Sequence, residues 1–421
     1  MELKRVGLVS LHTSPLETPG SADAGGLNVY VVALAEQLAA LGYEPELITR
    51  AASPEHPQTG YTEAGVPVRF LQAGPREPVP KADLARHMYA FRDALRELPR
   101  FDILHSHYWL SGAAALAVAE QQGVPHIQSL HTVAALKNAH LAPGDRPEPV
   151  ERLWGEQRLV QESAFTISST VEEKTAVVES YGADPDRVLV IPPGVDRSLF
   201  HPAQGFGAAG GSIPGGSAPG GSAPDAQPLG GRAARTARPG ILTLGRIQPL
   251  KGQDLAIRAL ATIPAERRPL LTIAGAPTPG EKKFERSLHT LVDDLGLGGD
   301  VVFVGTQTRQ AAAALIRESA LLLIPSHSET FGLVALEAAA SGTPVIASNS
   351  TGTGSSVSHL STGMLLPSRE PAVWGRAIDA LLSDPAGLAS LSASAARHAE
   401  LHTWRLTAEL TVEAYRRALR L

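Results

Sequence analysis

The chain alternates short apolar segments with longer amphipathic ones, and it does so in two consecutive series. In the first series, the amphipathic segments at residues 28–41 and 113–121 have the apolar spacing of helices. The apolar segments typical of buried strands are residues 6–11, 46–48, 103–105, 126–128 and 188–191, and then, in the second series, 241–244, 270–274, 301–304, 321–324 and 345–347. Such alternation predicts βα units and parallel sheets with helices on both faces. We therefore expect an α/β protein with two parallel-sheet domains, because 421 residues are too many for one ordinary core.

A segment of low complexity separates the two series. Between residues 204 and 239, three pentads of the pattern Gly-Gly-Ser-x-Pro run in tandem. Such a segment buries too little apolar surface to offset its ordering entropy, so we expect a flexible insertion in the connection between domains. The predicted domains are therefore residues 1–203 and 240–403, followed by a C-terminal helical segment at residues 404–421.

Composition narrows the class of partner. The net charge of −5 gives no basic field, so nucleic acid is not an expected partner. No apolar run approaches the ~20 residues that span a bilayer, and the N-terminus enters a strand without signal-peptide features, so we expect a cytoplasmic protein without a transmembrane segment. The absence of cysteine excludes disulfides, thiolate metal sites and cysteine nucleophiles. A homodimer stays open as the assembly.

Two carboxylates in the second series have the most informative setting. Glu329 follows the buried strand at residues 321–324, and Glu337 is expected about two turns into the next helix. The glycine turn at Gly332 opens that helix, whose first backbone amides favour an anion. Carboxylates for sugar hydroxyls beside donors for a diphosphate suit a nucleotide-sugar. The alternative is a surface helix with two solvated glutamates.

The segment from Glu329 to Ala347 closely resembles the donor-site signature of the retaining GT-B glycosyltransferases of family 4. This resemblance implies two Rossmann-like domains facing across a cleft, a last helix that crosses back onto the first domain, and no metal or other cofactor besides the nucleotide-sugar substrate. A second stretch, Gly245-Arg246 followed by Pro249-Leu250-Lys251-Gly252, fits the same family, and its cations would stabilise the charge on the departing diphosphate. The implied donor-binding residues are Gly26, Arg246, Lys251, Glu329 (transferred sugar), Phe331, Gly332, Leu333 and Glu337 (ribose).

Motifs of the first series resemble one subgroup of that family, which glycosylates D-inositol 3-phosphate at the start of mycothiol synthesis. They are residues 23–30 with two adjacent glycines, residues 105–112 after a buried strand, and residues 130–138. The resemblance implies a small-molecule acceptor and places His131 close to the transferred sugar. The implied acceptor-binding residues are Asn28, Lys81, Tyr108, Thr132 and Arg152, and the implied catalytic set is His131, Glu329, Arg246 and Lys251.

Two potential metal motifs are set aside. His105 and His107 have no carboxylate or cysteine at ligand spacing beside them. Asp184-Pro185-Asp186 is typical of a turn before the strand at residues 188–191. The loop at residues 348–356 departs from the Gly-Gly-hydrophobic-Pro form usual in the family, which leaves the donor less defined.

The predicted activity is retaining transfer from UDP-N-acetylglucosamine to D-inositol 3-phosphate. A family 4 enzyme with another acceptor, such as one like sucrose-phosphate synthase or one acting on a lipid or polysaccharide precursor, is the main alternative. A nucleotide-sugar epimerase of the same fold and a non-catalytic sugar-binding homologue are more distant alternatives. A nicotinamide oxidoreductase lacks its G-x-G-x-x-G fingerprint here.

Overall fold

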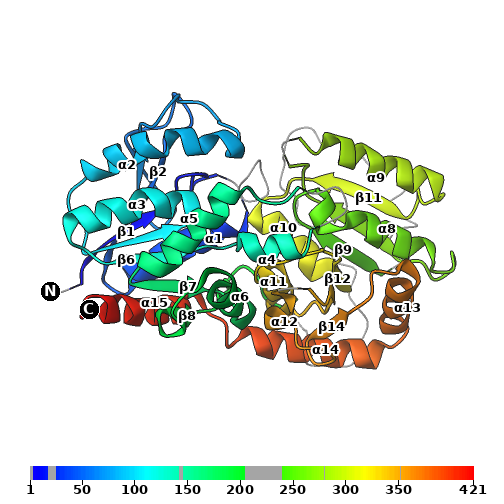
Figure 1. Ribbon diagram of the computed structural model, residues 1–421. Helices are drawn as coiled ribbons and strands as arrows, with labels where there is room; N and C mark the ends of the chain where they lie inside the picture. The colour runs from blue at the N-terminus through cyan, green and yellow to red at the C-terminus, as the bar shows by residue number, and fades with distance from the viewer. Residues whose placement is uncertain (1–2, 18–24, 142–145, 204–238, 279, 351) are drawn as a thin grey trace.

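The computed structural model describes residues 3–17, 25–141, 146–203, 239–278, 280–350 and 352–421. Apart from residue 239, the predicted flexible insertion at residues 204–239 lies outside the described residues. The described chain forms two parallel sheets, each covered by helices, which lie side by side in Figure 1. The predicted α/β fold is confirmed, whereas the bounds given above for the two domains stay predictions.

Eight strands of the described chain form the first sheet, in the order β3-β4-β2-β1-β5-β6-β7-β8. The strands are β1 Arg5–Val9, β2 Glu44–Arg50, β3 Thr59–Tyr61, β4 Pro67–Leu71, β5 Ile103–His107, β6 His126–Ser129, β7 Phe165–Ser168 and β8 Val188–Val190. All neighbours are parallel except β3 and β4. The helices are α1 Gly26–Ala40, α2 Met88–Arg96, α3 Trp109–Gln122, α4 Ala134–Ala139, α5 Val150–Glu162 and α6 Val171–Tyr181, with short 3-10 turns η1 Lys81–His87 and η2 Pro185–Arg187. The chain leaves β1 toward β2 on one side and returns to β5 on the other, so the carboxyl ends of β1 and β5 form a switch point of the kind where such sheets bind ligands.

The second sheet contains six strands of the described chain, all parallel, in the order β11-β10-β9-β12-β13-β14. The strands are β9 Gly240–Leu244, β10 Leu270–Ala274, β11 Val301–Gly305, β12 Leu321–Ile324, β13 Val345–Ser348 and β14 Gly363–Leu366. The helices are α8 Gln253–Ala261, α9 Lys282–Asp294, α10 Arg309–Glu318, α11 Leu333–Ala340, α12 Thr353–Ser356, α13 Pro371–Leu382 and α14 Pro385–Ala399, with the 3-10 turn η3 Pro249–Lys251. Its switch point lies between β9 and β12.

The last helix, α15 (Trp404–Ala418), packs on the first sheet and not on the second (Figure 1). Thr403 caps it by accepting a hydrogen bond from the amide of Leu406. Its apolar residues Trp404, Val412 and Tyr415 belong to the same buried core as β1 and α1. The C-terminal segment therefore crosses back, because its apolar stripe is buried against the first domain's core.

The two places where the chain passes between the sheets touch each other. The amide of Val195 donates to the carbonyl of His402 at 3.0 Å. A Cβ atom on Gly194 would overlap the backbone nitrogen of Trp404, so glycine permits the close approach. Among the residues that the structure describes, no helix combines the length and the apolar character needed to span a membrane.

Candidate active site

A cavity of about 410 Å³ lies between the two sheets, at the carboxyl ends of their central strands. Its walls come from both halves, because the loops after β1, β5 and β6 face those after β9 and β12. The predicted site residues that line it are Gly26, Lys81, Tyr108, His131, Thr132, Arg246, Lys251, Glu329, Phe331, Gly332, Leu333 and Glu337. Asn28 and Arg152 are described but do not line it.

On the second half, Glu329 and Lys251 form an ion pair inside the cavity. Lys251 Nζ lies 2.6 Å from Glu329 Oε1, and Ser326 Oγ donates to the same oxygen at 2.6 Å. Only 9% of the Glu329 side chain is exposed. The pair joins η3 to the loop before α11, so a cation and a carboxylate from segments 78 residues apart are held at one wall.

Glu337 lies closer to the start of its helix than predicted. Helix α11 begins only at Leu333, because Gly332 has a φ of +79° and ends the helical conformation before it. Glu337 is therefore just over one turn into the helix, and the prediction of two turns was wrong. Burial raises the pKa of its carboxyl group, and Arg309 opposes the rise from 3.3 Å away.

Arg309 and His12 are cavity residues that the sequence analysis missed. Arg309 is the first residue of α10, and its guanidinium lies 5.2 Å from the centre of the Phe200 ring. His12 follows β1, and its ring lies 4.4 Å from that of Tyr108. Both follow strands that the apolar pattern had identified, so the rule that ligands bind beyond strand carboxyl ends could have found them.

Three histidines of the first half are linked through the core. His107 Nδ1 lies 2.8 Å from Nε2 of His131, which has a φ of +61° and lines the cavity. His105 contacts the Tyr415 hydroxyl of α15 at 2.7 Å and Ser129 Oγ at 2.9 Å. Burial lowers the pKa of each imidazole, that of His131 to about 3, so all three are neutral at pH 7. Strand β5 ends at His107, two residues beyond the predicted end of the strand at His105.

Among the described residues, no group of three or more histidine, aspartate or glutamate side chains is arranged to hold a metal ion. Asp184 instead accepts a hydrogen bond from the amide of Asp186 at 2.9 Å within the η2 turn.

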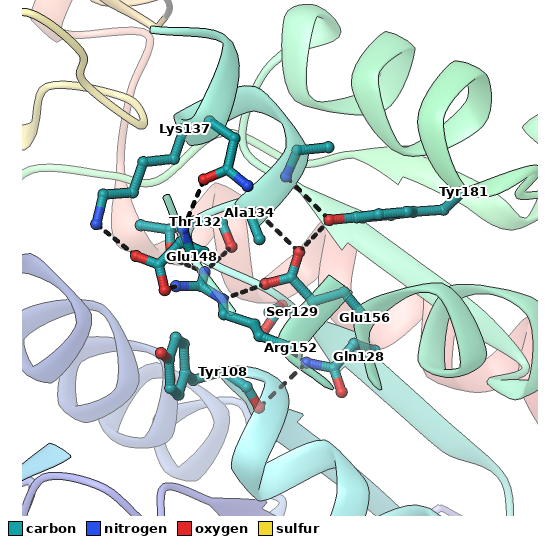
Figure 2. A network of polar contacts seen from close by, with 12 residues as sticks. Tyr108, Gln128, Ser129, Thr132, Ala134, Lys137, Glu148, Arg152, Glu156 and Tyr181 are labelled. Carbon is teal, nitrogen blue, oxygen red and sulfur yellow. Dashed lines mark hydrogen bonds and ion pairs between the residues drawn. The ribbon is translucent and has the colours of Figure 1, made fainter. Parts of the chain in front are cut away.

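On the first half, Tyr108 stands between two cations. Lys81 Nζ lies 4.4 Å from the centre of its ring and the Arg152 guanidinium carbon 4.9 Å. Tyr108 has a φ of +76° and precedes α3, and burial raises the pKa of its hydroxyl to about 12. Arg152 also donates to the carbonyl and the hydroxyl oxygen of Thr132, at 2.9 and 2.8 Å, which ties these residues into one wall (Figure 2).

Arg152 is held from behind by two carboxylates (Figure 2). Its Nε lies 2.6 Å from Glu156 Oε1 and its Nη1 2.9 Å from Glu148 Oε2. Glu156 also accepts from the Tyr181 hydroxyl at 2.7 Å and from the amide of Ala134 at 2.8 Å. The network therefore fixes the start of α4 and the orientation of Arg152 together.

Asn28 organises the loop that precedes α1. Its amide nitrogen donates to the carbonyl of Ser14 at 2.6 Å and to Thr13 Oγ1 at 3.1 Å, and its Oδ1 accepts from the amide of Gly25 at 3.3 Å. Its side chain is buried and joins the backbone at Ser14 to the backbone at Gly25 by hydrogen bonds. Gly26 beside it faces Leu333 of the other half, whose Cδ1 would lie 3.1 Å from a Cβ atom at that position.

Comparison with known proteins agrees with this geometry. Residues 25–194 match the family described as Glycosyl transferase 4-like domain, and residues 232–399 match Glycosyl transferases group 1. Among curated relatives, a D-inositol 3-phosphate glycosyltransferase of Frankia alni is 42% identical, over 97% of this chain and 98% of its own. One of Stackebrandtia nassauensis is 40% identical, over 98% of this chain and 91% of its own.

Solved structures show the same architecture. The sucrose-phosphate synthase of Thermosynechococcus elongatus superposes with a TM-score of 0.85 at 26% identity, over 98% of each chain. Anabaena HepE, solved in complex with UDP and glucose, superposes with a TM-score of 0.75 at 18% identity, over 97% of this chain and 98% of its own, which shows the fold alone. Two facing parallel sheets with a cleft between them define a glycosyltransferase of the GT-B class. Within that class, the chain belongs to glycosyltransferase family 4.

Proposed function

We propose that this glycosyltransferase moves N-acetylglucosamine from its UDP derivative to a hydroxyl of D-inositol 3-phosphate, with retention of anomeric configuration. The observation that carries the acceptor is the wall formed by Lys81, Tyr108 and Thr132, which line the cavity with Arg152 directly behind them. Charge-assisted donors of this kind suit a phosphate group. The curated relatives that are about 40% identical and carry the name D-inositol 3-phosphate glycosyltransferase support the same acceptor.

The donor occupies the opposite wall in this proposal. Arg246 and Lys251 bind the diphosphate, Glu337 accepts from the ribose hydroxyls, and Glu329 contacts the transferred sugar while holding Lys251 in place. The UDP bound to HepE supports a uridine donor by analogy of fold. Gly26 leaves room for the phosphates where the two halves approach each other.

The chemistry follows from these positions. The acceptor hydroxyl attacks the anomeric carbon on the face that the diphosphate leaves, so one C–O bond forms as the other breaks. The proton passes to a phosphate oxygen of the leaving group, and Arg246 and Lys251 stabilise the charge that develops there. Neutral His131 is able to hydrogen-bond a hydroxyl of the sugar, with its orientation fixed by His107.

The test is UDP release from UDP-N-acetylglucosamine with and without D-inositol 3-phosphate, with the product identified by mass. We expect release that depends on the acceptor and a product heavier by one N-acetylhexosamine residue. Fructose 6-phosphate serves as the alternative acceptor, because the chain also resembles sucrose-phosphate synthase. Turnover of that sugar phosphate alone would refute the proposed acceptor.

Replacing Lys251 should separate donor chemistry from acceptor binding. Lys251→Ala removes a cation that stabilises the leaving diphosphate, so kcat should fall by roughly 100-fold while the KM for the acceptor changes little. Lys81→Ala should instead raise the acceptor KM. Steady-state kinetics in both substrates measures each effect, and a Lys251→Ala enzyme with unchanged kcat would exclude its assigned role.

A further inference from the structure

Glu148 places a negative charge at the wall where the proposed acceptor's phosphate binds. One of its carboxylate oxygens lies 2.9 Å from Arg152 Nη1, and the other pairs with Lys137 Nζ (Figure 2). Lys137 itself lines the cavity. The carboxylate thus bridges two cations, one at the cavity surface and one directly behind it.

Holding Arg152 in place does not require Glu148. Glu156, whose side chain is fully buried, binds Nε of the same guanidinium at 2.6 Å, and both oxygens of Thr132 accept from Nη2. Glu148 is different, because 17% of its side chain is exposed. The backbone of Glu148 is anchored separately, because its amide donates to Asn138 Oδ1 at 2.7 Å. The carboxylate is therefore able to move while the backbone stays in place.

The charges at this wall are balanced while Glu148 is in place. Lys137 and Arg152 are matched by Glu148 and Glu156. Burial tends to raise the pKa of Glu148, but Arg152 and Lys137 outweigh this effect and lower it, so the group is ionised at neutral pH. A phosphate monoester carries close to two negative charges at that pH and three acceptor oxygens.

We propose that Glu148 is a specificity-determining residue of the acceptor site: it occupies Lys137 and Arg152 until a phosphate dianion takes them over. This inference rests on the proposed function. A dianion binds guanidinium and ammonium groups more strongly than one carboxylate does, because it offers more charge and more acceptor oxygens. A monoanion or an uncharged polyol cannot displace Glu148, so the carboxylate selects for a phosphorylated acceptor and lowers its affinity at the same time.

The experiment is titration of inorganic phosphate into the full-length protein at pH 7.5 with saturating UDP, which fills the diphosphate subsite. Glu148→Gln keeps the shape of the side chain and removes its charge, so phosphate should bind roughly tenfold more tightly. The KM for D-inositol 3-phosphate should fall in parallel. The matched control is Glu151→Gln, an exposed residue of α5 outside the network. Equal or weaker phosphate binding by Glu148→Gln, or equal tightening in the control, would overturn the proposal.

A second variant keeps the test decisive if Glu148→Gln does not fold. Lys137→Gln removes the cavity cation that Glu148 holds, so phosphate should bind roughly tenfold more weakly, and unchanged binding would overturn the proposal. Failure of the proposed function looks different: the wild-type enzyme would then not turn over D-inositol 3-phosphate, while the phosphate titrations would still decide the role of Glu148.

Discussion

Glu173 shows how a capping residue acquires an unusual ionisation. It is the third residue of α6, where its amide donates to the side chain of Thr170 and its carboxylate accepts from the amide of Ser169 at 2.7 Å. The spacing of Thr170 and Glu173 is that of a capping box, which the sequence displays. Its carboxyl group is nevertheless buried beside the cavity, and burial raises its pKa to about 7.

The free energy of unfolding should depend on the proton of the Glu173 carboxyl group. The folded protein binds it more tightly than the unfolded chain, whose pKa is near 4.5. The stabilisation that protonated Glu173 contributes to the free energy of unfolding is therefore complete below pH 4.5. It is lost as pH rises through 7, by roughly 3 kcal/mol in total. Glu173→Gln does not titrate, so its free energy of unfolding relative to wild type should rise between pH 5 and pH 8. Urea denaturation of both proteins at four pH values measures this, and a constant difference would contradict it.

The role of Arg152 illustrates what local pattern reveals about the site. Arg152 was predicted as an acceptor ligand, and the structure places it behind the wall, in contact with Thr132. Its carboxylate partner Glu156 stands four residues later on α5, a spacing that signals an ion pair on a helix, and its other partner, Glu148, stands four residues earlier, before the helix begins. The sequence spacing therefore indicates the ion pairs of Arg152, but it does not indicate the direction in which the Arg152 guanidinium points.

At the scale of elements, most central strands were predictable because both of their faces are buried, which produces continuous apolar runs, whereas β3, β4, β7 and β14 were missed. Lys251 and Glu329 were predictable because they follow such runs, whereas Arg309 follows one too and was missed. The start of α11 was predictable from the turn at Gly332. The pairing of Arg309 with Glu337 was not, because it joins two helices through residues 28 positions apart, and a local apolar pattern does not reveal such a pairing.

Strand β6 carries a buried base that should make the fold sensitive to acid. His126 contacts Ser106 Oγ at 2.7 Å and Ser163 Oγ at 2.8 Å, and burial lowers its pKa to about 3. The unfolded chain takes up a proton near pH 6.5, whereas the folded protein does not. Stability from this residue is therefore present above pH 6.5 and is lost as pH falls, by roughly 2 kcal/mol at pH 5.

The measurement compares wild type with His126→Gln, whose amide retains polar contacts but does not titrate. The free energy of unfolding of wild type should fall more steeply between pH 7 and pH 5 than that of the variant. Parallel pH profiles would show that His126 is protonated in the folded protein as well.

At the scale of the whole molecule, the two halves are joined where Gly194 meets Trp404. Gly194→Ala places a Cβ atom against the backbone nitrogen of Trp404, so the crossing must shift and stability should fall by roughly 3 kcal/mol. Gly298→Ala is the control, because a Cβ atom there meets nothing within 4 Å. Thermal denaturation distinguishes the two variants, and equal melting temperatures would mean that the crossing adjusts without cost.

The course of α15 also determines how the molecule bears mechanical load. The N-terminal strand and the C-terminal helix share one core, so both ends of the chain are attached to the same half (Figure 1). Tension applied between the two ends runs through the interface of α15 with the first sheet and bypasses the second sheet, whose connections are bonded to each other at Val195 and His402. The second sheet is thus mechanically shielded: under a stretching force, α15 is peeled away before that sheet carries any load.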